Sequence, residues 1–289
     1  MNNKKKISIS TGGFKNLTGL QAAKFLSNNK IDCIELSGGK YSKDQLKSLI
    51  QLKKKIRLRV HNYFPPPQIP FVLNLASNNK KILNRSISHI KNSIKLVKKL
   101  DGEYYSFHAG FRVDPNFKLL GQNFKKIDMM DREKCLKNFS QQVLKISKFA
   151  KKHNVKILIE NNVCSKKNFE RFGDNPFLLT NYKEIKKFFK KMPKNVRLLI
   201  DVAHLKVSTK TEKFDPIKSL TQMNKFAGGY HFSDNDGKTD SNKPIKNNSW
   251  FFPYLKKNLN YYSAEIYNEN PRKLKQQIKI LNEKLSFKK

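Results

Sequence analysis

The stretch VKILIENN at residues 155–162 decides the fold that we predict for this chain. It indicates a buried strand that carries one carboxylate, Glu160, to its C-terminal end. Five other short apolar runs have the same design, because each finishes on a side chain that can bind a metal ion or move a proton. They are RLRVH with His61, YYSFH with His108, VRLLID with Asp201, GGYHF with His231 and YYSAEI with Glu265, and His204 follows Asp201 three residues later. These strand ends predict one polar site at the mouth of a barrel.

Patterns typical of strands and helices alternate eight times along the chain, which favours parallel strands joined by crossover helices. The predicted strands are 6–11, 32–39, 56–61, 104–108, 155–160, 196–201, 228–234 and 261–267, and the predicted helices include 17–29, 42–54, 80–100, 136–152, 182–192 and 271–285. We therefore predict an α/β fold, a (β/α)8 TIM barrel, as a single domain over residues 1–289. An open doubly wound sheet is the alternative, but the chain lacks both G-x-G-x-x-G after its first strand and G-x-x-x-x-G-K-[ST].

The formal net charge of +38 has two interpretations. A strongly basic protein attracts polyanions, which points to nucleic acid. Alternatively, lysine simply fills the solvated helix faces, as in a chain with a compositional bias towards Lys, Asn and Ile. The lysine runs are dispersed along the chain rather than gathered in one arm, which favours the second interpretation. Basic residues predicted on loops at the rim of the site, where they would face DNA or a sugar phosphate, are Arg112, Lys166, Lys167, Lys206, Lys210 and Lys243.

Cysteine usage and hydropathy place the protein in the cytoplasm in our prediction. The three cysteines, Cys33, Cys135 and Cys164, are far apart and odd in number, which indicates neither a disulfide framework nor a cysteine zinc site. The chain starts with basic residues and no apolar segment, so we expect no signal peptide. No run approaches the roughly 18 apolar residues that span a bilayer, so we expect no membrane association. We predict surface positions for His89 and His153, and no chemical role for Cys164.

Four of the strand-end residues form a candidate metal site, namely Glu160, Asp201, His231 and Glu265. Three carboxylates and one imidazole suit Mn²⁺, Mg²⁺ or Co²⁺, and Zn²⁺ also fits. Open coordination positions would then take two neighbouring substrate oxygens and polarise a carbonyl. His61, His108 and His204 would add ligands or bind substrate. Glu35, in the middle of the second predicted strand, either reaches the site or has a structural partner.

Six motifs together resemble a known family. HNYFPPP (61–67), FHAGF (107–111), LIENN (158–162), DVAH (201–204), HFSDNDG (231–237) and AEIY (264–267) are similar to the xylose-isomerase-like barrels of sugar phosphate isomerases and epimerases. In that branch the resemblance implies one metal ion on the four candidate ligands. It also implies that Glu160 and Glu265 form an acid–base pair, which moves a proton next to a carbonyl through a metal-stabilised enediolate. His204 would contact a substrate hydroxyl.

Endonuclease IV, an abasic-site DNA repair enzyme, belongs to the same superfamily and uses a three-zinc cluster. Its ligands would fall here on His61, His108, Glu160, Asp201, His204, His231, Asp240, position 242 and Glu265. Position 242 is Asn, which removes a strong zinc ligand, so we expect the third zinc site to be weakened or lost. The glycines that usually follow this element are replaced by KNNS (246–249).

Three function classes follow from these observations. The first choice is a metal-dependent sugar or sugar-phosphate isomerase or epimerase, which implies a small-molecule substrate. The alternative is an abasic-site DNA endonuclease with two or three zinc ions. The third is a non-catalytic barrel used for binding or scaffolding, whose signature would be loss of the carboxylates. The sequence leaves open the identity of the sugar, its phosphorylation and whether the chain forms a homo-oligomer.

Overall fold

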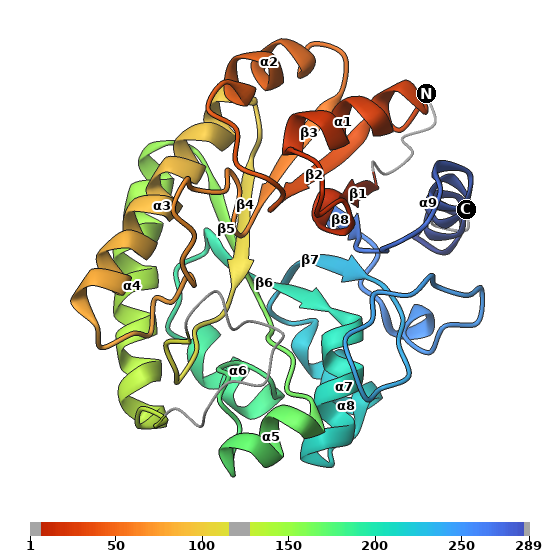
Figure 1. The fold of residues 1–289 in the computed structure, drawn as a ribbon. Helices are drawn as coiled ribbons and strands as arrows, with labels where there is room; N and C mark the ends of the chain where they lie inside the picture. Colours follow the sequence, from red (N-terminus) through yellow and green to blue (C-terminus); the bar gives the residue numbers. More distant parts are fainter. Residues whose placement is uncertain (1–6, 116–127, 286–289) are drawn as a thin grey trace.

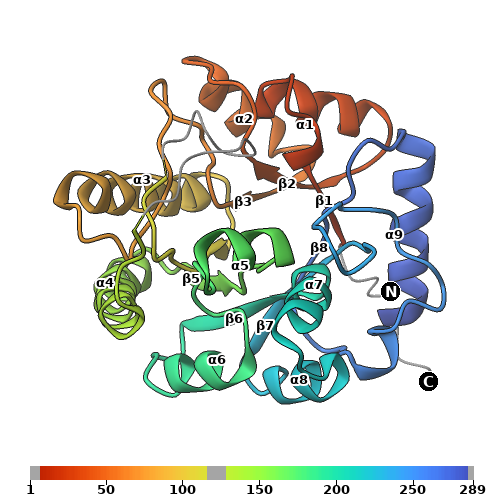
Figure 2. The ribbon, with the colours of Figure 1, turned by 60° about the horizontal axis from the view of Figure 1, so that its bottom comes forward.

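A computed structural model describes residues 7–115 and 128–285 of the chain. Its strands close into a parallel barrel in which each strand pairs with the next in sequence and β8 pairs with β1 (Figures 1 and 2). The strands are β1 (Ser8–Ser10), β2 (Cys33–Ser37), β3 (Arg57–His61), β4 (Tyr104–His108), β5 (Lys156–Glu160), β6 (Val196–Asp201), β7 (Ala227–Phe232) and β8 (Tyr261–Ala264). The predicted (β/α)8 barrel and all eight of its predicted strands are therefore confirmed.

Helices surround this barrel on its outside, except that α5 (Lys166–Phe172) lies in front of the strands (Figure 2). They are α1 (Gly19–Asn28), α2 (Gln45–Leu52), α3 (Lys80–Lys99), α4 (Arg132–Lys152), α5 (Lys166–Phe172), α6 (Tyr182–Phe189), α7 (Val202–Glu212), α8 (Pro216–Met223) and α9 (Pro271–Leu285), with the short 3-10 turns η1 (Thr11–Gly13) and η3 (Phe252–Tyr254). The six predicted helices are confirmed with small changes at their ends. Helix α5 was not predicted, because it lies in a segment that we read as a loop. Helix α7 begins directly after Asp201, the last residue of β6, so no turn residues separate the strand from the helix in the sequence.

Side chains that cap the helices explain where several of them begin. Thr18 forms a capping box with Gln21 at the start of α1. Asn79 and Asp131 accept hydrogen bonds from the first turns of α3 and α4. Lysines in the last turns of α3 and α4 complement the negative end of each helix dipole.

The main core lies between the barrel and its helices. Helix α3 buries Ile90, Ile94 and Val97, as its spacing predicts, and α4 buries Phe139 and Val143. The lysines of α3 are all exposed on the opposite face: Lys80, Lys81, Lys91, Lys95, Lys98 and Lys99. This distribution supports the interpretation of the net charge as solvated helix surface.

The barrel interior has an apolar lower part and a polar upper part. Leu158, Leu199 and Tyr261 form a small buried cluster inside the barrel. Alternate residues of a strand point to the same face, so Glu160 and Asp201 lie in the same interior, one layer closer to the C-terminal strand ends. The sequence thus positions its acids where TIM barrels carry their active sites.

No helix in the described ranges 7–115 and 128–285 has the length and apolarity needed to cross a membrane. The prediction about a signal peptide rests on a start that includes residues 1–6, which lie outside those ranges.

Candidate active site

The four predicted metal ligands converge at the C-terminal end of the barrel. One ligand atom from each of Glu160, Asp201, His231 and Glu265 lies within 4.8 Å of the other three. The Nδ1 atom of His231 is 3.4 Å from Glu160 Oε1 and 3.6 Å from Glu265 Oε2. All four side chains are buried. The residues come from β5, β6, β7 and the end of β8, whose carboxyl ends meet because the strands are parallel.

Atoms in this group lack the partners that a buried polar atom normally has. Both carboxylate oxygens of Glu160, Asp201 Oδ2 and His231 Nδ1 are buried without a hydrogen bond. Such atoms are costly to bury unless something compensates them. The other oxygen of Asp201 caps α7 by accepting from the His204 N–H at 2.7 Å, which leaves Oδ2 turned to the group. A divalent cation fits this set of donors.

The pKa shifts of the buried acids also favour a bound cation. Burial raises the pKa of Asp201 to about 7, although the His204 imidazole opposes the shift. Burial would also raise the pKa of Glu160, but the imidazoles of His108 and His231 outweigh it and hold that pKa well below its usual range. The Glu160 carboxylate adds to the rise in the pKa of Asp201, because two negative charges this close repel each other. An additional cation would let both remain ionised.

His61 and His108 lie on the other side of Glu160. The Nε2 atom of His61 is 3.5 Å from Glu160 Oε2, and Nδ1 of His108 is 3.8 Å from the same oxygen. Ligand atoms of these three residues lie within 4.8 Å of one another, so they form a second group that shares Glu160 with the first.

His204 and Asp240 form a pair at the entrance of the site. Nε2 of His204 lies 3.1 Å from Asp240 Oδ2, and Nδ1 lies 2.9 Å from the Asn161 carbonyl oxygen. Burial alone would lower the pKa of His204, but Asp201 and Asp240 raise it well above its usual value. The pair therefore presents a carboxylate held by an imidazolium, with the Asp240 side chain 27% exposed.

A pocket of about 340 Å³ opens above these residues. Its lining combines candidate ligands with amides and aromatic rings: Ser37, His61, Asn62, His108, Phe111, Asn162, Val163, Asn168, Phe177, His204, Asp240, Glu265 and Tyr267. This volume is at the small end for ligand pockets, and the lining suits a small polar molecule.

Tyr267 is a lining residue that sequence reasoning missed. A Cβ atom at position 12 would lie only 2.5 Å from the Tyr267 hydroxyl oxygen. The glycine at this position therefore leaves room for the tyrosine ring. The signal was available in the AEIY motif and in the paired glycines after the first strand. Tyr261, inside the barrel, was also missed.

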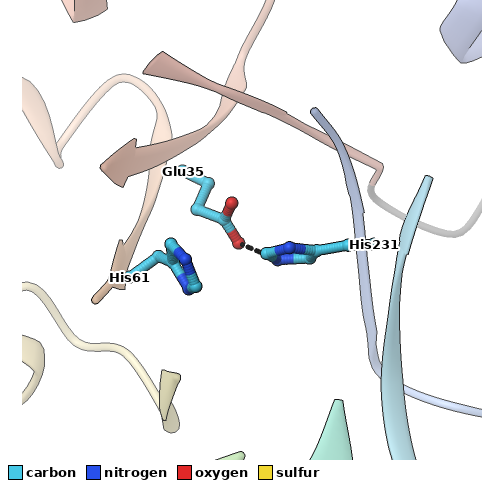
Figure 3. A group of neighbouring side chains, drawn as sticks. All are labelled: Glu35, His61 and His231. Atoms are coloured by element: carbon cyan, nitrogen blue, oxygen red, sulfur yellow. Dashed lines mark hydrogen bonds and ion pairs between the residues drawn. The ribbon is translucent and has the colours of Figure 1, made fainter. Parts of the chain in front are cut away.

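Glu35 has a structural partner and also reaches the site. Its Oε2 atom lies 3.1 Å from Nε2 of His231, as Figure 3 shows, and accepts from the Tyr261 hydroxyl. Burial would raise the pKa of Glu35, but His231 outweighs it and lowers the pKa to about 2. The sequence left open whether Glu35 reaches the site or has a structural partner, and the structure shows both.

Two expected surface positions need correction. His89 is buried at 9% exposure because the loop after β3 covers α3, and its ring stacks on Tyr63. His153 is half-buried at the end of α4, where its Nδ1 lies 2.9 Å from the Phe149 carbonyl oxygen. Cys164, for which we predict no chemical role, is buried, and this burial raises the pKa of its thiol to about 12.

Three of the basic residues predicted on rim loops are buried or lie on a helix instead. Arg112 lies in a loop but is buried, where its guanidinium is bound to Asp174 and donates to the Asn175 carbonyl at 2.8 Å. Lys206 and Lys210 lie on α7 and donate to Asp234 at 2.6 Å and to the Asp236 carbonyl at 2.8 Å.

The remaining three basic residues are exposed. Lys166 and Lys167 begin α5 rather than a loop. Lys243 stays in a loop, where its backbone pairs with that of Asp234. Its neighbour Asn242 is buried with a positive φ of 46°, a conformation that asparagine tolerates better than most residues.

A family model described as the xylose isomerase-like TIM barrel matches residues 23–284. The chain belongs to this family. The resemblance carried by the six sequence motifs is thereby confirmed. Among curated proteins, no sequence matches the chain at a significant level.

Solved structures with the same fold cover nearly the whole chain. A D-tagatose 3-epimerase-like protein has 19% identity and a TM-score of 0.70, with 97% of this chain and 100% of that one covered. A D-psicose 3-epimerase from Clostridium cellulolyticum, solved with D-tagatose, has 14% identity and a TM-score of 0.65 over 97% and 96% of the two chains. The TTHB071 protein from Thermus thermophilus, soaked with ZnCl₂, has 14% identity and a TM-score of 0.64 over 96% and 98%.

Proposed function

We propose that this protein is a divalent-metal-dependent isomerase or epimerase of a sugar or sugar phosphate. One observation carries the proposal: Glu160 and Glu265 both approach His231 Nδ1, in a group where both oxygens of Glu160, Asp201 Oδ2 and His231 Nδ1 are buried without a hydrogen bond. Glu265 also lines the pocket of about 340 Å³. The similar folds of the D-tagatose 3-epimerase-like protein and the D-psicose 3-epimerase support the choice of reaction.

Glu160, Asp201, His231 and Glu265 would hold the ion. When bound, it would polarise the substrate carbonyl and disperse the negative charge that develops there. The same donors include oxygen and nitrogen, which suits Mn²⁺, Mg²⁺, Co²⁺ or Zn²⁺.

The two glutamates would carry the proton. A general base must be ionised, and the lowered pKa of Glu160 keeps its carboxylate charged at neutral pH. One glutamate takes the proton from the carbon next to the carbonyl, which leaves an enediolate. The other returns a proton to the opposite face, or to the neighbouring carbon in an isomerase. Ser10 donates to Glu265 Oε1 at 3.1 Å and so fixes one end of this pair.

The pair of His204 and Asp240 would orient the substrate. Both side chains line the pocket, and the Asp240 carboxylate can accept a hydrogen bond from a sugar hydroxyl. Phe111 and Phe177, whose ring centroids are 5.7 Å apart, supply an apolar wall against the sugar ring or chain.

The test uses Glu160→Gln, which keeps the side-chain shape and removes the base. Ketose sugars and their phosphates are incubated with the protein in D₂O, and deuterium uptake next to the carbonyl is measured by mass spectrometry. We expect the variant to lose about 10²–10⁴-fold in exchange rate. The matched control is Glu103→Gln, an exposed acid that precedes β4 at the other end of the barrel. Exchange at the wild-type rate in Glu160→Gln would remove the proposed mechanism.

A second candidate is an abasic-site endonuclease with a zinc cluster. The group of His61, His108 and Glu160 favours it, because it lies beside the first group and shares Glu160. Against it, Asn242 replaces a zinc ligand, and Arg112 and Lys206 are engaged in ion pairs rather than free for phosphates.

Metal content separates the two candidates. Protein purified without chelator should contain a single divalent ion per chain if it is the isomerase, and two or three zinc ions if it is the nuclease. Binding to an abasic duplex should also weaken steeply with salt if DNA is the substrate. Salt-independent binding would count against the nuclease.

A further inference from the structure

Below the candidate metal ligands, a chain of hydrogen bonds links His231 to His61. Tyr261 is its centre: its hydroxyl donates to Glu35 Oε2 and lies 3.0 Å from Ser106 Oγ. At one end, Glu35 Oε2 is 3.1 Å from His231 Nε2. At the other end, Ser106 Oγ is 2.9 Å from His61 Nδ1. Figure 3 shows the Glu35 carboxylate beside the two imidazole rings, with its bond to His231.

The hydrogens in this chain have one consistent arrangement. A carboxylate oxygen only accepts, so Glu35 Oε2 takes both the Tyr261 O–H and the His231 Nε2–H. Because the phenolic hydrogen is then used, the Ser106 hydroxyl must donate to the Tyr261 oxygen. Ser106 Oγ is left to accept, and it accepts the Nδ1–H of His61.

This arrangement decides which nitrogen each ring offers to the site. His231 presents Nδ1, which lies 3.4 Å from Glu160 Oε1 and is buried without a hydrogen bond. His61 presents Nε2, which lies 3.5 Å from Glu160 Oε2. Each ring thus turns the nitrogen that this chain leaves unused towards one oxygen of the same carboxylate.

The barrel floor holds the centre of the chain in place. The guanidinium of Arg59 lies 4.4 Å from the centroid of the Tyr261 ring. It donates to Ser8 Oγ at 2.9 Å and to the Tyr262 carbonyl at 2.7 Å, so it is fixed to β1 and β8. Tyr261 is fully buried, and its hydroxyl has little freedom to choose other partners.

We propose that Glu35, Tyr261 and Ser106 act as a positioning network, which fixes the ring orientations of His231 and His61 so that Nδ1 of His231 and Nε2 of His61 are the nitrogens left to bind an ion beside Glu160. Hydrogen bonds of this kind raise the affinity of a metal site by holding the imidazole in its ligating orientation. The inference rests on the metal site of the proposed function and is independent of which reaction the site catalyses.

Affinity for Co²⁺, measured by calorimetry together with the visible absorption of the ion, tests the network without an activity assay. We expect Glu35→Gln and Tyr261→Phe each to weaken Co²⁺ binding about 10–100-fold. The double variant should lose much less than the product of the two single losses, because both changes break one chain.

Tyr262→Phe is the matched control. It is the next residue of β8, and its hydroxyl contacts Leu259 N at 2.9 Å and Lys256 O at 3.2 Å on the outside of the barrel. We expect it to bind Co²⁺ as wild type does.

Wild-type Co²⁺ affinity in both folded single variants, or equal losses in Tyr261→Phe and Tyr262→Phe, would overturn the positioning role while leaving the metal site standing. Failure of the wild-type protein to bind Co²⁺ would overturn the metal site itself, and the network proposal with it. If Glu35→Gln does not fold, Tyr261→Phe decides alone, because it keeps the ring that packs on Arg59.

Discussion

Acidification from pH 6.5 to pH 4 is expected to destabilise this protein through His89, a buried imidazole that is not among the candidate ligands. The side chain projects from α3, stacks on Tyr63 with ring centroids 5.3 Å apart, and places Nε2 3.3 Å from the Asn62 carbonyl oxygen. Burial lowers the pKa of His89 from 6.5 to about 4, although the bond to Asn62 opposes the shift.

The sign of the effect follows from where the proton binds. In the unfolded chain the imidazole takes up a proton as the pH falls through 6.5, whereas in the folded protein it stays neutral until about pH 4. Protons therefore favour the unfolded state across this window. The contribution of neutral His89 to stability is complete above pH 6.5 and is lost progressively down to pH 4.

The magnitude is set by the difference between the two pKa values. Each unit corresponds to about 1.4 kcal/mol, so the shift from 6.5 to about 4 is worth about 3 kcal/mol of unfolding free energy. This is a large part of the stability of an ordinary domain, which is about 5–15 kcal/mol.

Urea unfolding at closely spaced pH values between 7.5 and 4 measures the effect, with stability taken from the linear dependence on denaturant. His89→Gln keeps an N–H for the Asn62 carbonyl and removes the titration, so its stability should fall by about 3 kcal/mol less than that of wild type over this range. Ser88→Gln, at the exposed neighbouring position of α3, should follow wild type. Parallel curves for wild type and His89→Gln would refute the reasoning.

Two further predictions concern the metal ion and a buried arginine. Chelation with EDTA should lower the melting temperature, and excess Mn²⁺ or Co²⁺ should restore it. The reason is that an ion at about 100 times its dissociation constant stabilises the folded state by about 2.7 kcal/mol. An unchanged melting temperature would argue against a metal ion bound by Glu160 and its neighbours. Arg112→Met should reduce the unfolding free energy by about 1–3 kcal/mol, because it removes a buried guanidinium that bonds to Asp174 and to the carbonyl oxygens of Met130 and Asn175. Its control is Lys187→Met, which breaks an exposed ion pair with Glu133 and should cost less than about 1 kcal/mol. Equal losses in these two variants, measured by urea unfolding, would contradict a structural role for Arg112.

Local patterns in the chain are sufficient to predict the barrel and the residues that meet at its mouth. Apolar runs that end on Glu160, Asp201 and His231 are enough for this, because parallel strands bring their carboxyl ends to one edge of the barrel. Period-two alternation then places each acid in the interior, whichever helix follows. These predictions required no knowledge of how distant segments pack.

The residues beneath and around that site come together only through packing between distant parts of the chain. Whether Glu35 in the middle of β2 reaches His231 depends on the stagger of the strands, in which Ser10 pairs with Glu35 and Ser37 with His61. That stagger is a property of the closed barrel and leaves no local trace in the sequence. His89 and Arg112 were misjudged for a related reason: each is covered by a segment without periodicity, so burial there arises from packing between parts of the chain that are distant in sequence.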